Sequence, residues 1–129
     1  MAGSVDLFAA ANTAMRQAYA PYSHFPVGAA IRTGSGKVFA GANMENASYP
    51  EGWCAETSAI AHMVMAGERN IAEVAVVAEK MARITPCGGC RQRLKEFGTA
   101  ETLVHLCDPN GFVETVKLGD LLPKAFELG

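Results

Sequence analysis

The sequence lacks an excess of basic residues and long apolar runs, and both absences restrict its function. It contains 11 Lys and Arg against 13 Asp and Glu, so its formal net charge is −2. A chain without a basic excess has no positive surface to follow a nucleic-acid backbone. No stretch reaches the roughly 20 apolar residues of a membrane span, and no basic segment precedes an apolar core at the N-terminus. We therefore expect a cytoplasmic protein that acts on a small molecule, without nucleic-acid or membrane partners.

Linkers, low-complexity tracts and internal repeats are also lacking. Hydrophobic residues make up 50% of the 129 residues and charged residues 19%, which indicates a folded globular chain that can bury a core. The length suits one domain, so we expect residues 1–129 to form a single unit.

The order of helix and strand patterns predicts an α/β sandwich on a five-stranded mixed sheet. Helices are expected over residues 4–19, 54–66 and 86–97. Strands are expected over residues 27–33, 37–42, 73–79, 102–107 and 112–118. Ser4 can cap the first helix, and a short helical or irregular tail follows from Leu121. An antiparallel hairpin would come first and parallel β-α-β units would follow. The polar segment 43–52 is long for a connection in a compact domain, which indicates a functional loop.

Four cysteines, Cys54, Cys87, Cys90 and Cys107, carry the strongest chemical signal. In a chain with its own core and no secretory signal, they favour metal binding or catalysis over disulfides. Cys87 and Cys90 lie three residues apart at the start of a predicted helix, so both sulfurs face the same way. Cys54 begins another helix, and helix N-termini favour thiolates, the form that zinc binds. Three sulfurs around one zinc leave a fourth position open, as in catalytic zinc sites.

Glu56 follows Cys54 by two residues and can lie near a metal without binding it. Zinc with an open position makes water available as hydroxide near neutral pH. A neighbouring carboxylate can move a proton from that water to a substrate nitrogen, which favours a hydrolytic deaminase. Three thiolates (−3) and one zinc ion (+2) leave a charge of −1, which opposes this acidification. Arg91, beside Cys90, is the expected compensating cation, whereas Thr57 offers only a neutral hydroxyl.

These residues follow the pattern of the zinc nucleobase deaminases: His or Cys, one residue, Glu, and later Pro-Cys-x-x-Cys. The pattern here reads Cys54-Ala55-Glu56 and Pro86-Cys87-Gly88-Gly89-Cys90. The chain closely resembles the small homotetrameric cytidine deaminases in the segments YAPYSHFPVGAA (19–30), GANMENASYPEG (41–52), PCGGCRQ (86–92) and LLPKAF (121–126). The resemblance covers nearly the whole chain. It implies the cytidine deaminase-like three-layer α/β/α fold and one Zn²⁺ per chain. It also implies conversion of cytidine or deoxycytidine to uridine or deoxyuridine plus ammonia, in pyrimidine salvage.

The same resemblance implies which residues bind the nucleoside. Asn43 and Glu45 would bind the ribose 3′-hydroxyl, and Phe25 would stack near the base. The backbone around Ala55 and the carboxylate of Glu56 would read the edge of the pyrimidine. From composition alone, Asn43 and Glu45 could be ordinary turn residues.

The resemblance further implies a homotetramer with its active sites at subunit interfaces. Tyr49 and Phe126 would reach into the site of a neighbouring subunit. Many members of the family have Arg directly after the Cys-Ala-Glu triplet, where it hydrogen-bonds the ligand sulfurs. This chain has Thr57 there, so Arg91 is expected to carry more of the charge compensation.

Other interpretations of these residues stay open. Cys87 and Cys90 could instead form a redox-active pair. A non-catalytic module with a structural four-sulfur zinc site would use Cys107 as the fourth ligand. Cys107 ends an apolar strand, however, which is typical of a buried core thiol. A modified nucleoside or a nucleoside-like antibiotic is an alternative substrate. His24, His62 and His105 occupy a loop, a helix interior and a strand, where we expect structural roles.

Overall fold

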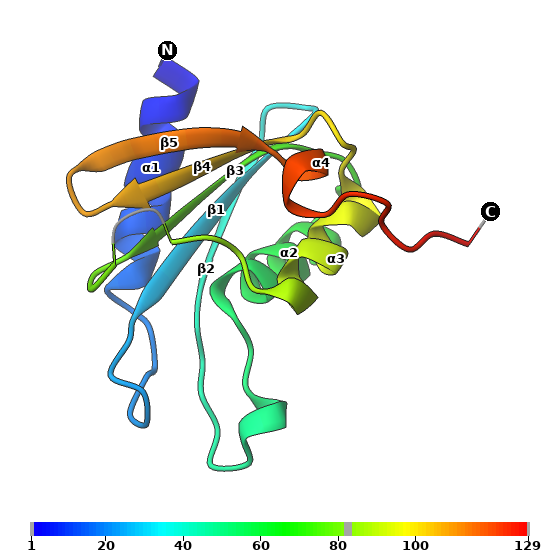
Figure 1. Cartoon of the computed structure of the whole chain (residues 1–129). Coiled ribbons are helices and arrows are strands. Elements are labelled where there is room, and N and C mark those ends of the chain that lie inside the picture. The colour runs from blue at the N-terminus through cyan, green and yellow to red at the C-terminus, as the bar shows by residue number, and fades with distance from the viewer. Residues whose placement is uncertain (1, 82–83, 129) are drawn as a thin grey trace.

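The computed structural model describes residues 2–81 and 84–128, which form one sheet with helices on both faces (Figure 1). The elements, in chain order, are α1 (Ala2–Met15), β1 (Val27–Thr33), β2 (Val38–Ala42), a 3-10 helix (Tyr49–Glu51), α2 (Ala55–Met65), β3 (Ile71–Ala78), α3 (Gly88–Phe97), β4 (Leu103–Asp108), β5 (Gly111–Lys117) and α4 (Leu118–Leu121). The strand order is β2-β1-β3-β4-β5. β1 runs antiparallel to β2 and β3, β3 and β4 are parallel, and β5 is antiparallel to β4. The predicted five-stranded mixed sheet is therefore confirmed.

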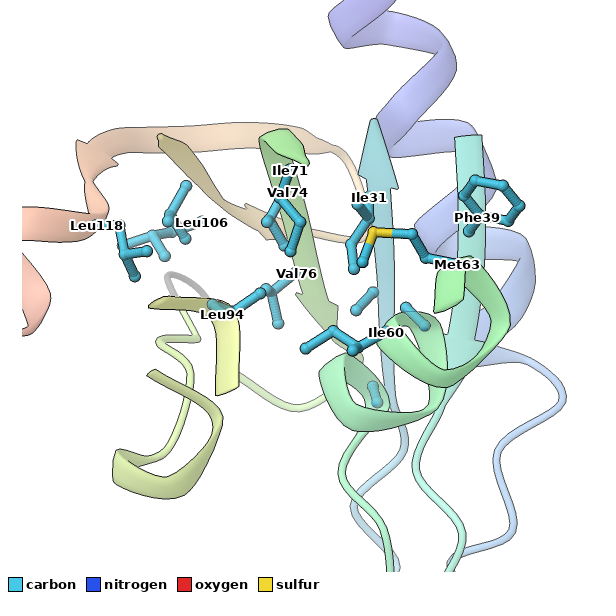
Figure 2. Close-up of a cluster of buried hydrophobic side chains, with 14 residues drawn as sticks. Ile31, Phe39, Ile60, Met63, Ile71, Val74, Val76, Leu94, Leu106 and Leu118 are labelled. Atoms are coloured by element: carbon cyan, nitrogen blue, oxygen red, sulfur yellow. The ribbon is translucent and has the colours of Figure 1, made fainter. Parts of the chain in front are cut away.

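Side chains from the two faces of the sheet form two separate cores. Along β3, Val74 and Val76 belong to the cluster that α2 and α3 cover, whereas Ala75 and Val77 belong to the cluster beneath α1. This alternation is the period-two pattern of a strand, and burial on both faces explains the nearly continuous apolar run of β3. Figure 2 shows the larger cluster, in which Met63 of α2 lies against the strands. The three layers follow directly from this alternation.

Two glycines let the helices approach the sheet closely. A Cβ on Gly41 of β2 would lie 2.4 Å from the backbone nitrogen of Ala59 in α2. A Cβ on Gly28 of β1 would lie 2.1 Å from the carbonyl oxygen of Ala11 in α1. Neither position has room for a side chain. The helix α2, which begins directly after Cys54, is therefore seated on the backbone of β2.

The N-terminal helix differs from its prediction at both ends. It ends at Met15, because residues 16–18 form turns, and Tyr19 forms an isolated bridge with Met44 instead of extending the helix. The helix begins at Ala2, so the predicted cap Ser4 lies inside it and that prediction is wrong. Each predicted strand is found, with ends shifted by at most two residues.

The third helix also differs from its prediction. It begins at Gly88 with Cys87 at its N-cap position, so Pro86 stands before the helix and not within it. The short helix α4 ends at Leu121, where the predicted helical or irregular tail begins, and residues 122–128 are irregular, which agrees with that prediction. In the stretches 2–81 and 84–128, no helix has the combined length and apolar character needed to cross a bilayer.

Two segments project from the layered body. The connection between β2 and α2 extends beyond the sheet, and the tail after α4 extends away from it (Figure 1). The connection is held by the bridges of Met44 with Tyr19 and with Trp53. These segments carry Tyr49 and Phe126, the two aromatic residues expected to contact a neighbouring subunit.

Candidate active site

Three cysteines meet where α2 and α3 begin. Cys54 occupies the N-cap position of α2, Cys87 that of α3, and Cys90 lies in the first turn of α3. Neither N-cap side chain hydrogen-bonds to its own helix, so both sulfurs are available to each other. The three Sγ atoms lie within 4.8 Å of one another, and those of Cys54 and Cys87 are 3.7 Å apart. The fold thus brings together sulfurs that are 33 residues apart in the chain.

The spacing of these sulfurs fits a zinc ion. Zn–S bonds of about 2.3 Å at tetrahedral angles place neighbouring sulfurs about 3.8 Å apart. The 3.7 Å separation of the Cys54 and Cys87 sulfurs matches this value. Cys90 is buried, Cys54 half-buried and Cys87 exposed, so one side of the cluster faces solvent. Three sulfur donors with an open side are the donor set of a catalytic zinc site, whereas structural sites fill all four positions.

The other cysteine and the histidines lie elsewhere. Cys107 belongs to the core beneath α1, on the opposite face of the sheet, where burial raises the pKa of its thiol to about 12. It cannot complete a four-sulfur site with the cluster. His105 contacts Glu73 through Nε2 at 2.6 Å, His62 stacks edge-on against a ring of β2, and His24 lies in a loop. The structural roles expected for the three histidines fit these positions.

The proton balance of the cluster depends on contacts between the sulfurs. A hydrogen bond from Cys90 lowers the pKa of Cys54, against the opposing effect of burial. The same contact with Cys54, followed by burial, raises the pKa of Cys90. The Oγ1 of Thr57 lies 3.7 Å from the Cys90 sulfur, and this contact lowers the pKa of Cys90 and so opposes part of the rise. Cys54 therefore ionises more readily than Cys90, and metal binding requires loss of the Cys90 proton.

Glu56 is a buried acid beside the cluster. It lies in the first turn of α2, and only 4% of its surface is exposed. Burial raises the pKa of its carboxyl, whereas its own backbone amide, the Cys90 thiol and the charge of Arg93 oppose the rise. A carboxyl shielded from water, with its pKa moved upward, is suited to take up and release a proton.

A cavity of about 420 Å³ opens beside Cys54. The 22–23 loop, the 43–46 segment and the residues that lead from Tyr49 to Cys54 form its walls. Its volume is that of a site for a small molecule. Of the residues predicted to bind substrate, Asn43, Glu45 and Tyr49 line this cavity.

Glu45 and Asn43 also hold the wall of the cavity in place. The backbone amides of Tyr22 and Ser23 donate to Oε1 of Glu45 at 2.9 and 3.0 Å, and the Ser23 hydroxyl donates to Oε2. These bonds, the Ser23 hydroxyl first, lower the pKa of Glu45. Asn43 accepts a hydrogen bond from the first amide of β1 at 2.9 Å and donates to the Phe25 carbonyl at 3.0 Å. Both side chains therefore shape the cavity that they line, and Glu45 carries its negative charge there.

The predicted aromatic and backbone binding residues differ in their relation to the cavity. Phe25 is half-buried and Ala55 is buried at the start of α2, and neither is among the described residues that line the cavity. Tyr49 is 75% exposed and its ring meets that of Tyr22 edge-on at 6.0 Å. Phe126 is 69% exposed on the C-terminal tail. Their contact with a neighbouring subunit stays a prediction.

Arg91 donates hydrogen bonds to two backbone carbonyls. Its Nε donates to the Pro86 carbonyl at 2.8 Å, and its Nη1 donates to the Leu121 carbonyl at 2.9 Å. The side chain therefore ties the turn before Cys87 to the end of α4. This geometry supports a positioning role for Arg91, and its role in charge compensation stays a prediction.

Sequence reasoning missed Ser23, Trp53 and Arg93. Ser23 holds Glu45, Trp53 lines the cavity, and the charge of Arg93 acts on Glu56. No local pattern marks the first two, because their partners are brought near by the fold. The spacing of Arg93 from the cysteine pair was the one available signal, since residues three or four apart on a helix lie on the same side.

Comparisons with known proteins match most of the chain. The family model described as "Cytidine and deoxycytidylate deaminase zinc-binding region" matches residues 3–106. A cytidine deaminase from Halalkalibacterium halodurans is 43% identical over 109 residues, which are 84% of this chain and 83% of that protein. The structure of a cytidine deaminase from Burkholderia pseudomallei is 48% identical, with a TM-score of 0.89, over 95% of this chain and 98% of that one. The structure of the cytidine deaminase from Mycobacterium tuberculosis is 39% identical, with a TM-score of 0.84, over 96% and 97%.

Proposed function

Because this chain belongs to the cytidine deaminase family and is a zinc-dependent cytidine deaminase, we propose that its three clustered cysteines hold the zinc ion while Glu56 moves the protons. The reaction replaces the amino group of cytidine by oxygen from water and yields uridine and ammonia. One observation carries the assignment of roles: three sulfurs lie within 4.8 Å of one another beside a carboxyl that is 4% exposed.

When bound, zinc supplies a Lewis acid that makes water a nucleophile near neutral pH. Glu56 accepts a proton from the attacking water and donates it to ring nitrogen N3. Glu56 then moves the second proton from the new C4 hydroxyl to the amino group, and ammonia leaves as the C4–N bond breaks and the carbonyl forms. Its burial keeps bulk water away, and the raised pKa of its carboxyl makes the protonated form accessible during turnover. Its position two residues after Cys54, in the first turn of α2, places it beside the sulfurs without making it a fourth ligand.

We propose that the substrate is an unphosphorylated nucleoside held in the 420 Å³ cavity. Asn43 and Glu45 would bind the ribose 3′-hydroxyl, and the ionised carboxylate of Glu45 would repel a phosphate there. Phe25 would stack near the base, since its backbone is tied to Asn43, and the backbone around Ala55 would read the pyrimidine. Deoxycytidine would then be a second substrate, and the physiological role would be pyrimidine salvage.

We further propose that residues 1–129 act as a single domain and assemble as a homotetramer in the cytoplasm. The exposed rings of Tyr49 and Phe126 support a role as contacts to the site of a neighbouring subunit. The two cores share one sheet, which supports a single folding unit. The mass of the protein in solution, measured by light scattering, tests the assembly, and a monomer that turns over cytidine at full rate would refute it.

The direct test of the function is turnover of cytidine by zinc-replete protein. Loss of the absorbance of the amino-substituted pyrimidine should accompany formation of uridine, and metal analysis should find one zinc per chain. Cytidine and deoxycytidine should both react. Zinc-loaded protein that turns over neither nucleoside would contradict the proposal.

The role of Glu56 is tested by Glu56→Gln, which keeps the shape of the side chain and removes its proton transfer. We expect kcat to fall by about 10²-fold to 10⁴-fold, which is the usual contribution of general acid–base catalysis. The zinc content should be retained. Glu101→Gln is the matched control, because the Glu101 side chain is 76% exposed and pairs with Lys117. Full activity of Glu56→Gln would remove this carboxyl from the mechanism.

A further inference from the structure

The sulfur cluster has a negative charge that position 57 does not balance. Three thiolates and one zinc ion sum to −1, and an ionised Glu56 adds another negative charge beside them. Thr57 places only a neutral hydroxyl 3.7 Å from the Cys90 sulfur. The guanidinium of Arg91 is directed at two backbone carbonyls. Arg91 keeps its positive charge in this position, and a second cation close to the cluster would offset more of the negative charge.

Arg93 lies on the side of α3 that faces the cluster. It follows Cys90 by three residues and Gly89 by four, and residues at these spacings share one side of a helix. Helical side chains lean toward the N-terminus, and the guanidinium of Arg93 does so. Its Nη1 lies 3.3 Å, and its Cζ 3.9 Å, from the point where a Cβ on Gly89 would stand. The positive charge therefore lies over the turn that joins Cys87 to Cys90.

Two further observations place this charge between the helices. Arg93 acts on Glu56, which belongs to α2, and its positive charge favours the ionised carboxyl. Arg93 also lines a surface hollow together with Ile60 of α2. Within residues 2–81 and 84–128, no hydrogen bond or ion pair engages the Arg93 guanidinium. Among the described residues, the acid on which the charge of Arg93 acts is therefore Glu56, beside the cluster.

We propose that Arg93 is a cation that offsets the negative charge of the cysteine–zinc centre in this chain, where an arginine at position 57 is lacking. Arg93 acts through its charge on the centre and on Glu56, and it touches no reacting atom. The absence of a side chain at Gly89 gives the guanidinium its room. The inference rests on the proposed ligation of zinc by the three cysteines.

The test compares the zinc affinity of three variants with that of the wild-type protein. Arg93→Gln removes the charge, Arg93→Lys keeps it, and Lys95→Gln removes a charge from the same helix that already pairs with Glu127 at 2.9 Å. Affinity is measured by competition with a chromophoric zinc chelator. Arg93→Gln should bind zinc about threefold to tenfold more weakly, which is the scale of a partly screened charge near an ion. Arg93→Lys and Lys95→Gln should stay close to wild type.

Salt dependence separates a charge effect from a merely structural one. The difference between wild type and Arg93→Gln should be largest at about 0.05 M salt and should shrink at about 1 M, where exposed charges are screened. In the Arg93→Gln background, Thr57→Arg should restore zinc affinity, because position 57 already contacts the Cys90 sulfur. Circular dichroism of each variant checks that the fold is retained.

Three results would each overturn the inference. The first is a zinc affinity of Arg93→Gln equal to that of wild type. The second is a decrease in zinc affinity in Arg93→Lys as large as that in Arg93→Gln. The third is a decrease in Arg93→Gln that is the same at low and high salt. The proposed function fails separately, if zinc-loaded wild-type protein leaves cytidine unchanged. Wild-type protein that binds zinc and turns over cytidine, together with an Arg93→Gln variant of equal affinity, would refute only the role of Arg93.

Discussion

Substitution of Gly41 by Ala should weaken zinc binding although Gly41 touches none of the proposed ligands. An added Cβ would lie 2.4 Å from the Ala59 nitrogen and 2.7 Å from the Cβ of Ser58. Ordinary van der Waals contacts begin at 3.4 Å, so the backbone of α2 must move by about 1 Å to relieve the overlap. The Ala59 nitrogen and the Ser58 carbonyl carbon, which would lie 2.8 Å away, belong to the helix backbone, so no side-chain rotation can relieve these contacts.

The movement would reach the metal site because Cys54 is the N-cap residue of the same helix. The sulfurs of Cys54 and Cys87 are 3.7 Å apart, close to the spacing that a shared zinc needs, and a 1 Å shift takes them away from it. Overpacking of this kind costs about 1–3 kcal/mol. If the whole cost falls on the metal-bound state, zinc affinity decreases about fivefold to 150-fold.

Chelator competition measures the affinity, and thermal unfolding of the metal-free protein measures how much of the cost falls on the fold itself. Gly34→Ala is the matched control, because its Cβ would meet only the Cβ of Asn70, at 3.8 Å. A Gly41→Ala protein with wild-type zinc affinity and wild-type melting temperature would show that α2 is not seated on β2 as described.

Three further variants or treatments test other parts of the site. Ser23→Ala removes the hydroxyl that bonds to Glu45, so KM for cytidine should rise about threefold to tenfold at nearly constant kcat; a loss confined to kcat would contradict this. Arg91→Ala leaves two backbone carbonyls without their donor, which should cost about 1–3 kcal/mol in urea unfolding, and unchanged stability would argue against its positioning role. Burial raises the pKa of Cys107 to about 12, so a thiol reagent should modify the exposed Cys87 of metal-free folded protein but not Cys107, as peptide mass mapping can show.

The strands could be predicted because each one carries its own signal. β3 is apolar on both faces, and the GSG turn at 34–36 marks the hairpin of β1 and β2. The order of strands in the sheet could not be predicted in this way. The chain passes from β2 through α2 to β3, yet β1 lies between these two strands and pairs with both. That arrangement depends on how α2 packs across the sheet, which no local pattern contains.

The cysteine cluster and Glu56 could be predicted because their spacing is that of a known chemical arrangement on helix N-termini. The contacts of Glu45 could not, since Ser23 lies 22 residues earlier and the two meet only when the 22–23 loop folds against the 43–46 segment. The same contact shows how a residue proposed to bind substrate can also have a structural role. An acid that accepts hydrogen bonds from two amides and one hydroxyl is fixed in place before any substrate arrives.

The role of Arg91 as a compensating cation stays a prediction, and helix geometry adds Arg93 as a second candidate. Arg91 is rotated by about 100° around the helix axis from Cys90, but it follows Cys87 by four residues and so shares a side of the helix with that proposed ligand. Arg91 bonds to the Pro86 and Leu121 carbonyls. A residue three positions after Cys90 returns to the same side, and Arg93 stands there with its guanidinium over Gly89. Arg91 follows Cys87, and Arg93 follows Cys90, by about one helical turn, so Thr57 does not leave this centre without a nearby cation.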